Sequence, residues 1–453
     1  MIGGMDKFDL VVIGAGTAGE AATHYARAQG ASVAIIDRDL FGGSCPFWAC
    51  MPSKALLHAA SVHHAGGDYP WSKASDFRDY MINREGTDAP DDAGHVASLE
   101  EAGATVIRGS AALVGPGQVR VGDRLLAADA VVLAVGSVSR VPHDLPGLAE
   151  AQPWTNVQGT GTRELPRSLV ILGAGPTGVE LSQVYARYGV PVTLVHPHDR
   201  VHDREHLRSS EFLAAGLERD GVRLRLGARA TAVRAAPRGG PHVVELDSGD
   251  SVEGHEILLA IGRELPLDGL GLETIGVKPN RGRLEPDDRL QIAEGVYVAG
   301  DAAGPEMHTH LGHYAGEAVV RIALGDKDYR PMLDAIPRAT YTDPETASVG
   351  LLMEQAKERG IDAGEYTEEI GSSAKGYTAE VEGHVTIVVD RSERVLVGAF
   401  MAGPAVSEAI HECVLAIRAR VPLATLADTI HAFPTVARVL GTAFIAASRE
   451  LGE

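Results

Sequence analysis

The sequence predicts an α/β protein in which two doubly wound units precede a C-terminal α+β domain. Three observations support this prediction. A pattern of apolar strand, glycine-rich turn, helix and second strand occurs near the N-terminus and returns 159 residues later. Alternating strand patterns followed by a helix occupy the last third of the chain. The length of 453 residues exceeds what one ordinary hydrophobic core serves and suggests about three domains.

The composition is typical of a globular enzyme. Hydrophobic residues make up 45% and charged residues 23% of the chain, which provides enough apolar material for large cores. The net charge of -20 disfavours nucleic acid and anionic membranes as partners, and no basic run offsets it. No stretch approaches 18 uninterrupted apolar residues, and no signal-peptide core precedes the first strand pattern. We therefore expect a cytoplasmic protein without a membrane or nucleic-acid partner.

The first repeat opens with an apolar run of strand length, Phe8 to Ile13, and a glycine-rich turn leads into a helix through Arg27. A second strand, Ser32 to Ile36, ends in Asp37. Glycines at such a turn let a diphosphate approach the helix N-terminus, and the terminal acid binds ribose hydroxyls. The pattern predicts a Rossmann-like dinucleotide site formed by Gly14, Gly16, Gly19 and Asp37.

The second repeat has a strand at Leu169 to Leu172, a helix ending at Arg187 and a strand at Val192 to Val195. Its turn contains Gly173, Gly175 and Gly178. Adding 159 to Asp37 gives His196, so the acid that favours an unphosphorylated ribose is absent, and Arg200 and Arg204 follow. This favours NADPH. NADH stays open, because the two arginines are also compatible with ordinary solvated loop charges.

Two of the three cysteines, Cys45 and Cys50, lie five positions apart behind a glycine pair. On a regular helix of ~100° per residue they would point about 140° apart and could not form a disulfide. We expect Pro46 and the preceding glycines to distort the helix enough to bring them together. The alternative is two buried cysteines that never bond.

Downstream of the first fingerprint, the stretch from Gly42 to Lys54 resembles a known motif, the glycine-led C-x-x-x-x-C-x-P-[ST]-K. That motif belongs to the flavin-linked pyridine nucleotide-disulfide oxidoreductases, which include dihydrolipoamide dehydrogenase, glutathione reductase and mercuric reductase. The resemblance implies FAD in the first fold and NAD(P)H in the second. It makes Cys50 the flavin-side thiol and Cys45 the interchange thiol facing a small-molecule substrate. Lys54 and Glu180 match the lysine and glutamate that pair beside the flavin.

Three further stretches resemble the family's flavin-binding segments. Val131 to Ser137 is similar to the A-T-G-[ST] turn, with Val135 in place of threonine. Val296 to Asp301 ends in the Gly-Asp pair, and Leu311 to Ala315 resembles the segment beneath the isoalloxazine. The resemblance implies FAD contacts at Gly14, Gly16, Gly19, Asp37, Gly43, Ser44, Lys54, Ala134, Gly136, Asp301 and His313. The implied coenzyme contacts are Gly173, Gly175, Gly178, His196, Arg200, Arg204 and Gly262.

From Ile336 the chain resembles the family's interface domain, which implies a homodimer. Strand patterns at Val385 to Val389 and Val395 to Ala399, with a helix at Ser407 to Arg418, fit its antiparallel sheet. The expected division is an FAD-binding domain at 1–147, an NAD(P)H-binding domain at 148–266, a second FAD-binding segment at 267–335 and a dimerisation domain at 336–453.

The C-terminus departs from the disulfide reductases, which carry a catalytic histidine before a proline and a glutamate that orients it. Here Phe433 precedes Pro434, and Arg438 replaces the glutamate. His431, two residues before Phe433, could act through water because alternate side chains of an extended segment face the same way. We favour the alternative that no protein base serves, which would slow ordinary disulfide interchange ~10²- to 10⁴-fold.

Mercuric reductase and 2-oxopropyl coenzyme M reductase/carboxylase also carry phenylalanine before that proline. Four functions therefore stay open. The first is a flavin-dependent NAD(P)H oxidoreductase whose dithiol reduces a small disulfide or other electrophile without the usual base. The others are a metal-ion reductase, a reductive cleavage and carboxylation enzyme, and a non-catalytic flavoprotein redox sensor. No resident metal site is expected.

Overall fold

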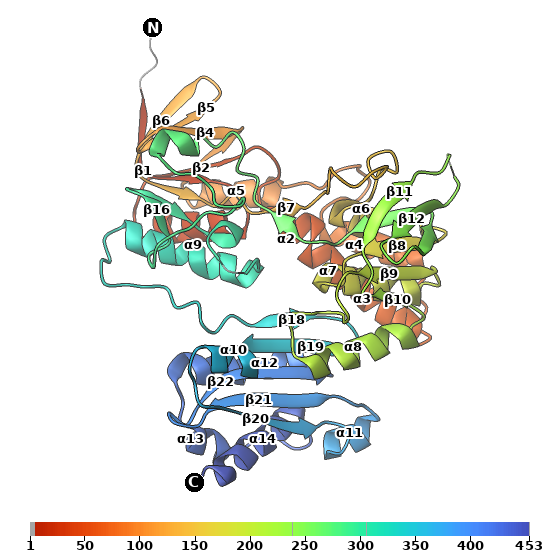
Figure 1. Cartoon of the computed structure of the whole chain (residues 1–453). Coiled ribbons are helices and arrows are strands. Elements are labelled where there is room, and N and C mark those ends of the chain that lie inside the picture. Colours follow the sequence, from red (N-terminus) through yellow and green to blue (C-terminus); the bar gives the residue numbers. More distant parts are fainter. Residues whose placement is uncertain (1–4, 238, 305, 453) are drawn as a thin grey trace. The chain divides into compact units, whose positions relative to one another are not determined.

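The computed structural model describes residues 5–237, 239–304 and 306–452, and these fall into two compact units (Figure 1). Unit 1 comprises Met1–Ala55, Ser72–Arg140 and Gly262–Pro331. Unit 2 comprises Leu56–Trp71, Val141–Ile261 and Met332–Glu453. The predicted fold class, two doubly wound domains followed by a C-terminal α+β domain, is confirmed.

Unit 1 is built on a sheet whose main strands run in the order β16-β17-β6-β1-β2-β3. The strands β1 (Asp6–Ile13), β2 (Val33–Asp37) and β6 (Arg124–Leu133) are parallel, so their carboxyl ends share one edge. Their central residues are fully buried, as expected for a parallel sheet covered on both faces. Helix α1 (Thr17–Ala28) packs on α9 (Thr309–Ala323), and the close approach depends on Gly316, where a Cβ would lie 2.3 Å from the Ala18 oxygen.

The remaining strands of unit 1 are β3 (Thr105–Arg108), β4 (Ala111–Gly115), β5 (Gln118–Val121), β7 (Val138–Ser139), β15 (Arg263–Glu264), β16 (Gln291–Ala293) and β17 (Val296–Val298). Its other helices are α2 (Ser44–Trp48), the start of α3 (Cys50–His64), most of α4 (Trp71–Met81), α5 (Ala93–Glu101) and the 3₁₀ turns η1 (Leu272–Ile275) and η2 (Gly300–Ala302).

Unit 2 contains the second repeat, a parallel sheet in the order β10-β9-β8-β14. Helix α7 (Pro176–Arg187) begins and ends 159 residues after α1, since 176 minus 17 and 187 minus 28 both give 159. Strand β9 (Val192–His196) keeps the same offset from β2. The predicted internal repeat is therefore confirmed residue by residue.

The other elements of this part of unit 2 are α6 (Asn156–Gly161), β8 (Leu169–Leu172), α8 (Leu207–Arg219), β10 (Arg223–Leu226), β11 (Ala230–Arg234), β12 (His242–Leu246), β13 (Ser251–Gly254) and β14 (Glu256–Leu259).

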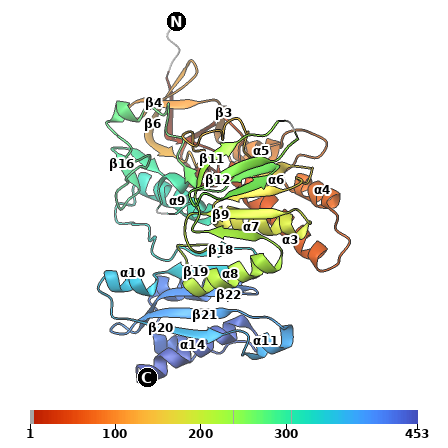
Figure 2. The same ribbon diagram turned by 45° about the vertical axis from the view of Figure 1, so that its right-hand side comes forward.

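The C-terminal part of unit 2 is an antiparallel sheet in the order β18-β19-β22-β21-β20, as the alternating pattern predicted. Helix α12 packs on β19 and β22, α14 packs on β20 and β21, and α8 runs along the sheet in both views (Figures 1 and 2). The elements are β18 (Arg338–Thr340), β19 (Glu345–Gly350), α10 (Met353–Glu358), β20 (Ala363–Glu369), α11 (Ala374–Ala379), β21 (His384–Asp390), β22 (Val395–Gly403), α12 (Val406–Ala419), α13 (Leu423–Ala427) and α14 (Val436–Glu450).

Candidate active site

The first glycine turn joins β1 to α1 at the carboxyl edge of the unit 1 sheet. Gly14 has φ +103°, and a Cβ there would lie 2.2 Å from the Ala134 oxygen. A Cβ on Gly16 would have only the Gly43 Cα within 4 Å, at 3.8 Å, which leaves room beside the helix N-terminus. The Ala15 N–H donates to Asp37 Oδ2 at 2.6 Å, so the strand-end acid is fixed against the turn. The arrangement fits a bound diphosphate and ribose.

The glycine pair before the dithiol packs against this turn. Gly42 has φ +101° and Gly43 has φ +72°, a backbone region that favours glycine. A Cβ on Gly43 would lie 2.6 Å from the Gly16 Cα. The two glycines thus let the cysteine segment lie directly beside the dinucleotide turn.

The break that brings the cysteines together lies at Ala49. Helix α2 includes Pro46 and ends at Trp48, Ala49 adopts φ −130° and ψ −95°, and α3 starts at Cys50. The expectation that Pro46 and the glycines supply the distortion was wrong, because Pro46 sits in the first turn of α2, where its missing N–H costs nothing. Cys45 and Cys50 are both free thiols and are hydrogen-bonded to each other.

A hydroxyl at the start of α9 also contacts the dithiol. Thr309 Oγ1 lies 3.2 Å from Cys50 Sγ. The hydrogen bond with Cys50 and burial raise the pKa of Cys45 above the usual thiol value, whereas the hydrogen bond with Thr309 lowers it. Sequence reasoning missed Thr309, because it lies 259 positions from Cys50 and no motif joins the two.

The Gly-Asp turn and the Ala134 to Ser137 turn are joined by a chain of hydrogen bonds. The Ser137 hydroxyl donates to the Asp301 carboxylate. Arg263 donates from Nε to the Ser137 hydroxyl at 2.6 Å and from Nη2 to the Ser137 carbonyl at 2.5 Å. Gly136 has φ +62°, and a Cβ there would meet nothing within 4 Å. The Ala134 to Ser137 turn lies beside Gly14, and the backbone at Gly136 is open on its Cβ side.

The second glycine turn reproduces the first. Gly173 has φ +105°, with a Cβ 2.3 Å from the Ala260 oxygen, and Gly175 would meet nothing within 4 Å. The Ala174 N–H donates to Nδ1 of His196 at 3.2 Å, as Ala15 does to Asp37. Arg200 donates to the carbonyls of Asp203 and Glu205, while Arg204 is exposed. The contacts of Arg200 weaken its interpretation as a phosphate ligand.

Two protein-family models match this chain. The model of the pyridine nucleotide-disulphide oxidoreductase family matches residues 8–317, and the model of that family's dimerisation domain matches residues 336–444. The chain belongs to the pyridine nucleotide-disulphide oxidoreductases. It is therefore an oxidoreductase of a family whose members bind FAD and use NAD(P)H, and the dimerisation domain makes it a homodimer. The non-catalytic alternative is set aside.

Two curated relatives and one solved structure match nearly the whole chain. Dihydrolipoyl dehydrogenase 3 of Pseudomonas aeruginosa is 36% identical over 467 residues, covering 96% of this chain and 97% of that protein. Mercuric reductase of Staphylococcus aureus is 26% identical, covering 98% of this chain and 83% of that protein. The crystal structure of LpdA from Mycobacterium tuberculosis is 26% identical, covers 98% of this chain and 99% of that chain, and has a TM-score of 0.85.

One of the implied FAD contacts, His313, lies on α9. His313 is 62% exposed and pairs with Glu317 at 3.4 Å on the outer face of α9. Gly312 and Gly316 take the inner face against α1, so the helical phase places His313 outside the α1–α9 contact. Its contact with FAD stays a prediction. Ser44, another implied FAD contact, is the first residue of α2. Gly262, an implied coenzyme contact, has φ +114°, a backbone conformation that favours glycine.

Lys54 and Glu180 lie in different units, so their pairing beside the flavin stays a prediction. Lys54 is half-buried on α3. Glu180 is buried on α7 and accepts a hydrogen bond from the Tyr341 N–H at 3.1 Å.

The C-terminal segment carries the substituted positions Phe433 and Arg438. Phe433 is 74% exposed and, with Pro434 and Arg438, lines a depression of about 270 Å³. Its other charged lining residues are Lys375, Glu368 and Glu369. The side chain of His431 is only 5% exposed, and its Nε2 lies 3.0 Å and 3.2 Å from the two carboxylate oxygens of Glu412 on α12. His431 is thus directed into the domain, and the hypothesis that it replaces the base loses its geometric support.

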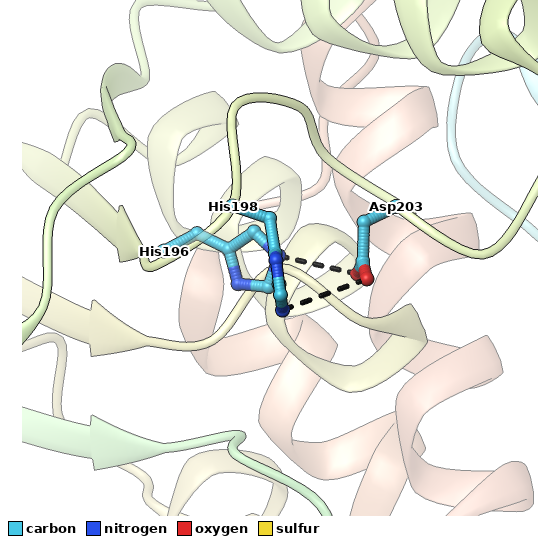
Figure 3. Close-up of side chains that lie close together, drawn as sticks. All are labelled: His196, His198 and Asp203. Atoms are coloured by element: carbon cyan, nitrogen blue, oxygen red, sulfur yellow. Dashed lines mark hydrogen bonds and ion pairs between the residues drawn. The ribbon is translucent and has the colours of Figure 1, made fainter.

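Two further features concern the predictions that the protein has no membrane partner and no resident metal site. Within the part of the chain that the structure describes, no helix combines the length and apolarity needed to cross a membrane. Among the same residues, His196, His198 and Asp203 bring three ligand-capable atoms within 4.8 Å of one another (Figure 3).

Proposed function

We propose that this enzyme passes electrons from NAD(P)H through FAD to a Cys45–Cys50 disulfide and on to a small electrophilic substrate without a histidine base. The observation that carries the proposal is the contact between the two thiols at the first glycine turn, with the Thr309 hydroxyl beside them. Bound FAD would supply the two-electron carrier between coenzyme and disulfide. Reduction of the disulfide by two electrons and two protons yields the dithiol, which returns both electrons to the substrate.

The roles of the chain's own residues follow from family resemblance and position. Cys50 would act on the flavin side, and Cys45 would attack the substrate as a thiolate. Asp37 and the glycine turn would hold the adenosine half of FAD, and Asp301 its ribityl chain. The proposed domains are 1–147, 148–266, 267–335 and 336–453. The cysteine usage also favours the proposed cytoplasmic location.

The altered C-terminus determines the proposed substrate class. In the family pattern a histidine stands at position 433 and a glutamate at position 438, where this chain carries Phe433 and Arg438. Lys375, Glu368 and Glu369 line the same depression as Arg438, so the reversal of charge at position 438 is the change that bears on the substrate. Cations attract anions and favour thiolates, whereas a glutamate would disfavour both. We infer that the substrate is anionic or electrophilic and requires no proton from a protein side chain.

The test is the paired variant Phe433→His with Arg438→Glu, assayed with lipoamide and glutathione disulfide. A positioned acid/base should raise turnover of these disulfides on the order of 10²-fold, whereas Phe433→Tyr, the matched control, should leave it low. Wild-type turnover of either disulfide at about 10 per second or more would contradict the proposal, because the missing base would then not limit the reaction.

A second candidate is reduction of a metal ion, which requires thiolates and no proton donor. Phe433 before Pro434 and the mercuric reductase relative favour it. Oxidation of NAD(P)H that depends on added Hg²⁺ and is lost in Cys45→Ser would select this function over disulfide reduction. Reductive cleavage and carboxylation, the third open function, would instead require product formation from a thioether and carbon dioxide.

A further inference from the structure

The residue at the end of the second strand, where a dinucleotide's ribose is expected to bind, differs between the two repeats. In the first repeat, Asp37 accepts the turn N–H directly and presents its carboxylate at the turn. In the second repeat, Nδ1 of His196 accepts a hydrogen bond from the Ala174 N–H. Nε2 of the same ring lies 3.2 Å from Oδ1 of Asp203 (Figure 3). The imidazole therefore acts as a spacer between the turn and a carboxylate supplied by the following loop.

The hydrogen-bond pattern fixes the proton on His196. Because Nδ1 accepts the Ala174 N–H, the proton of the neutral ring must sit on Nε2, from which it donates to Asp203. Burial lowers the pKa of His196, in agreement with a neutral ring. A metal ion would need the Nε2 lone pair, so this cluster is a hydrogen-bonded relay and not a metal centre.

The loop that carries Asp203 is held rigidly against the turn. Arg200 donates to the Asp203 carbonyl at 2.6 Å and to the Glu205 carbonyl at 2.9 Å. The His202 N–H donates to the Ala174 carbonyl at 3.1 Å, and the Val201 side chain is fully buried. Asp203 is thus positioned before any ligand binds.

Asp203 keeps a carboxylate available to a ligand. Its side chain is 30% exposed, and Oδ2 lies 3.7 Å from Nε2 of the more exposed His198. A carboxylate accepts hydrogen bonds from ribose hydroxyls, whereas it repels a 2'-phosphate that carries nearly two negative charges. Arg200 was expected to bind such a phosphate, but its guanidinium donates hydrogen bonds to the loop carbonyls of Asp203 and Glu205.

We propose that Asp203, oriented by His196, is the carboxylate that reads the adenosine ribose, and that the enzyme selects NADH over NADPH. The proposal rests on the assignment of the second repeat to the nicotinamide coenzyme. It reverses the expectation of NADPH drawn from the absence of an acid at position 196. The acid is present, but it comes from seven residues further along the chain.

The test is calorimetric binding of ADP-ribose and 2'-phospho-ADP-ribose to the FAD-loaded dimer. Wild type should bind ADP-ribose at least tenfold more tightly. Asp203→Asn keeps the shape and the acceptor for His196, and it should lose at least fivefold for ADP-ribose while gaining affinity for the phosphorylated ligand. Asp199→Asn, an exposed carboxylate of the same loop, is the matched control and should bind both ligands as wild type does.

Tighter binding of the phosphorylated ligand by wild type, or an unchanged ratio in Asp203→Asn, would overturn the proposal. Stoichiometric Zn²⁺ binding that is lost in His198→Ala would also overturn it, because the cluster would then be a metal site. Neither nucleotide ligand carries a nicotinamide to oxidise, so the measurement stays decisive even if the proposed substrate class fails. Failure of both ligands to bind would refute the coenzyme assignment together with the selection.

Discussion

The hydroxyl of Thr309, the first residue of α9, lies 3.2 Å from Sγ of Cys50, a residue 259 positions earlier in the chain. Cys50 and burial raise the pKa of Cys45, and the Thr309 hydroxyl acts against them by lowering it. Thr309 thus contacts Cys50 and shifts Cys45 towards the thiolate that the chemistry requires.

Thr309→Ala should make Cys45 less acidic. Loss of one hydrogen bond of about 1 kcal/mol corresponds to roughly 0.7 of a pKa unit and to about fivefold less thiolate at a given pH below the pKa. The measurement is the pH dependence of Cys45 alkylation by iodoacetamide in the reduced enzyme, whose profile should move to higher pH. Thr309→Ser keeps the hydroxyl and should retain the wild-type profile. Superimposable profiles for Thr309→Ala and wild type would refute the role.

His431 is expected to stabilise the fold and to take no part in catalysis. His431→Ala removes a buried side chain hydrogen-bonded to Glu412 and packed near Phe444, so the free energy of unfolding should fall by about 2 to 3 kcal/mol. Turnover per folded enzyme should not change. Urea unfolding and kcat with the best acceptor measure the two effects, with Glu412→Gln as the partner variant. A loss of kcat near 10²-fold without loss of stability would instead identify His431 as the base.

His384 makes stability depend on pH in acid. Burial, followed by the charges of His206 and Arg208, lowers the pKa of His384 to about 3 from 6.5. Between these values the unfolded chain binds a proton that the folded chain does not, so stability falls as pH decreases from 6.5 towards 3. At pH 5 the loss relative to pH 7.5 should be about 2 kcal/mol.

Urea midpoints at both pH values measure this loss. His384→Gln cannot titrate and should show a correspondingly smaller difference between pH 7.5 and pH 5, although it is less stable overall because Ser209 and Thr386 lose their imidazole partner. Equal differences for wild type and His384→Gln would show that another group causes the pH dependence.

The local elements of this protein could be predicted from sequence because their signals are local. Strand β8 matches its predicted bounds, and α7 starts at Pro176, directly after Gly175, and ends at Arg187. The break at Ala49 could not be predicted, because alanine favours a helix and gives no local signal of a break.

The contacts that define the site were less predictable because they join distant positions. Nothing in the sequence pairs Thr309 with Cys50 or His431 with Glu412. Asp203 was overlooked because the ribose-reading acid was sought only at the end of β9. His313 was chosen by motif resemblance, whereas the small residues Gly312 and Gly316 fix the phase of α9 and direct His313 outward.

The central claim, that Cys45 and Cys50 receive the electrons of NAD(P)H through FAD, is tested most directly by anaerobic titration with NADH and NADPH. Wild type should take up more than two electrons per flavin and develop a long-wavelength band from thiolate-to-flavin charge transfer. Cys50→Ser should abolish the band, and Cys45→Ser should show it more strongly in the oxidised enzyme. Uptake of only two electrons by wild type, or a band that survives in Cys50→Ser, would contradict the account.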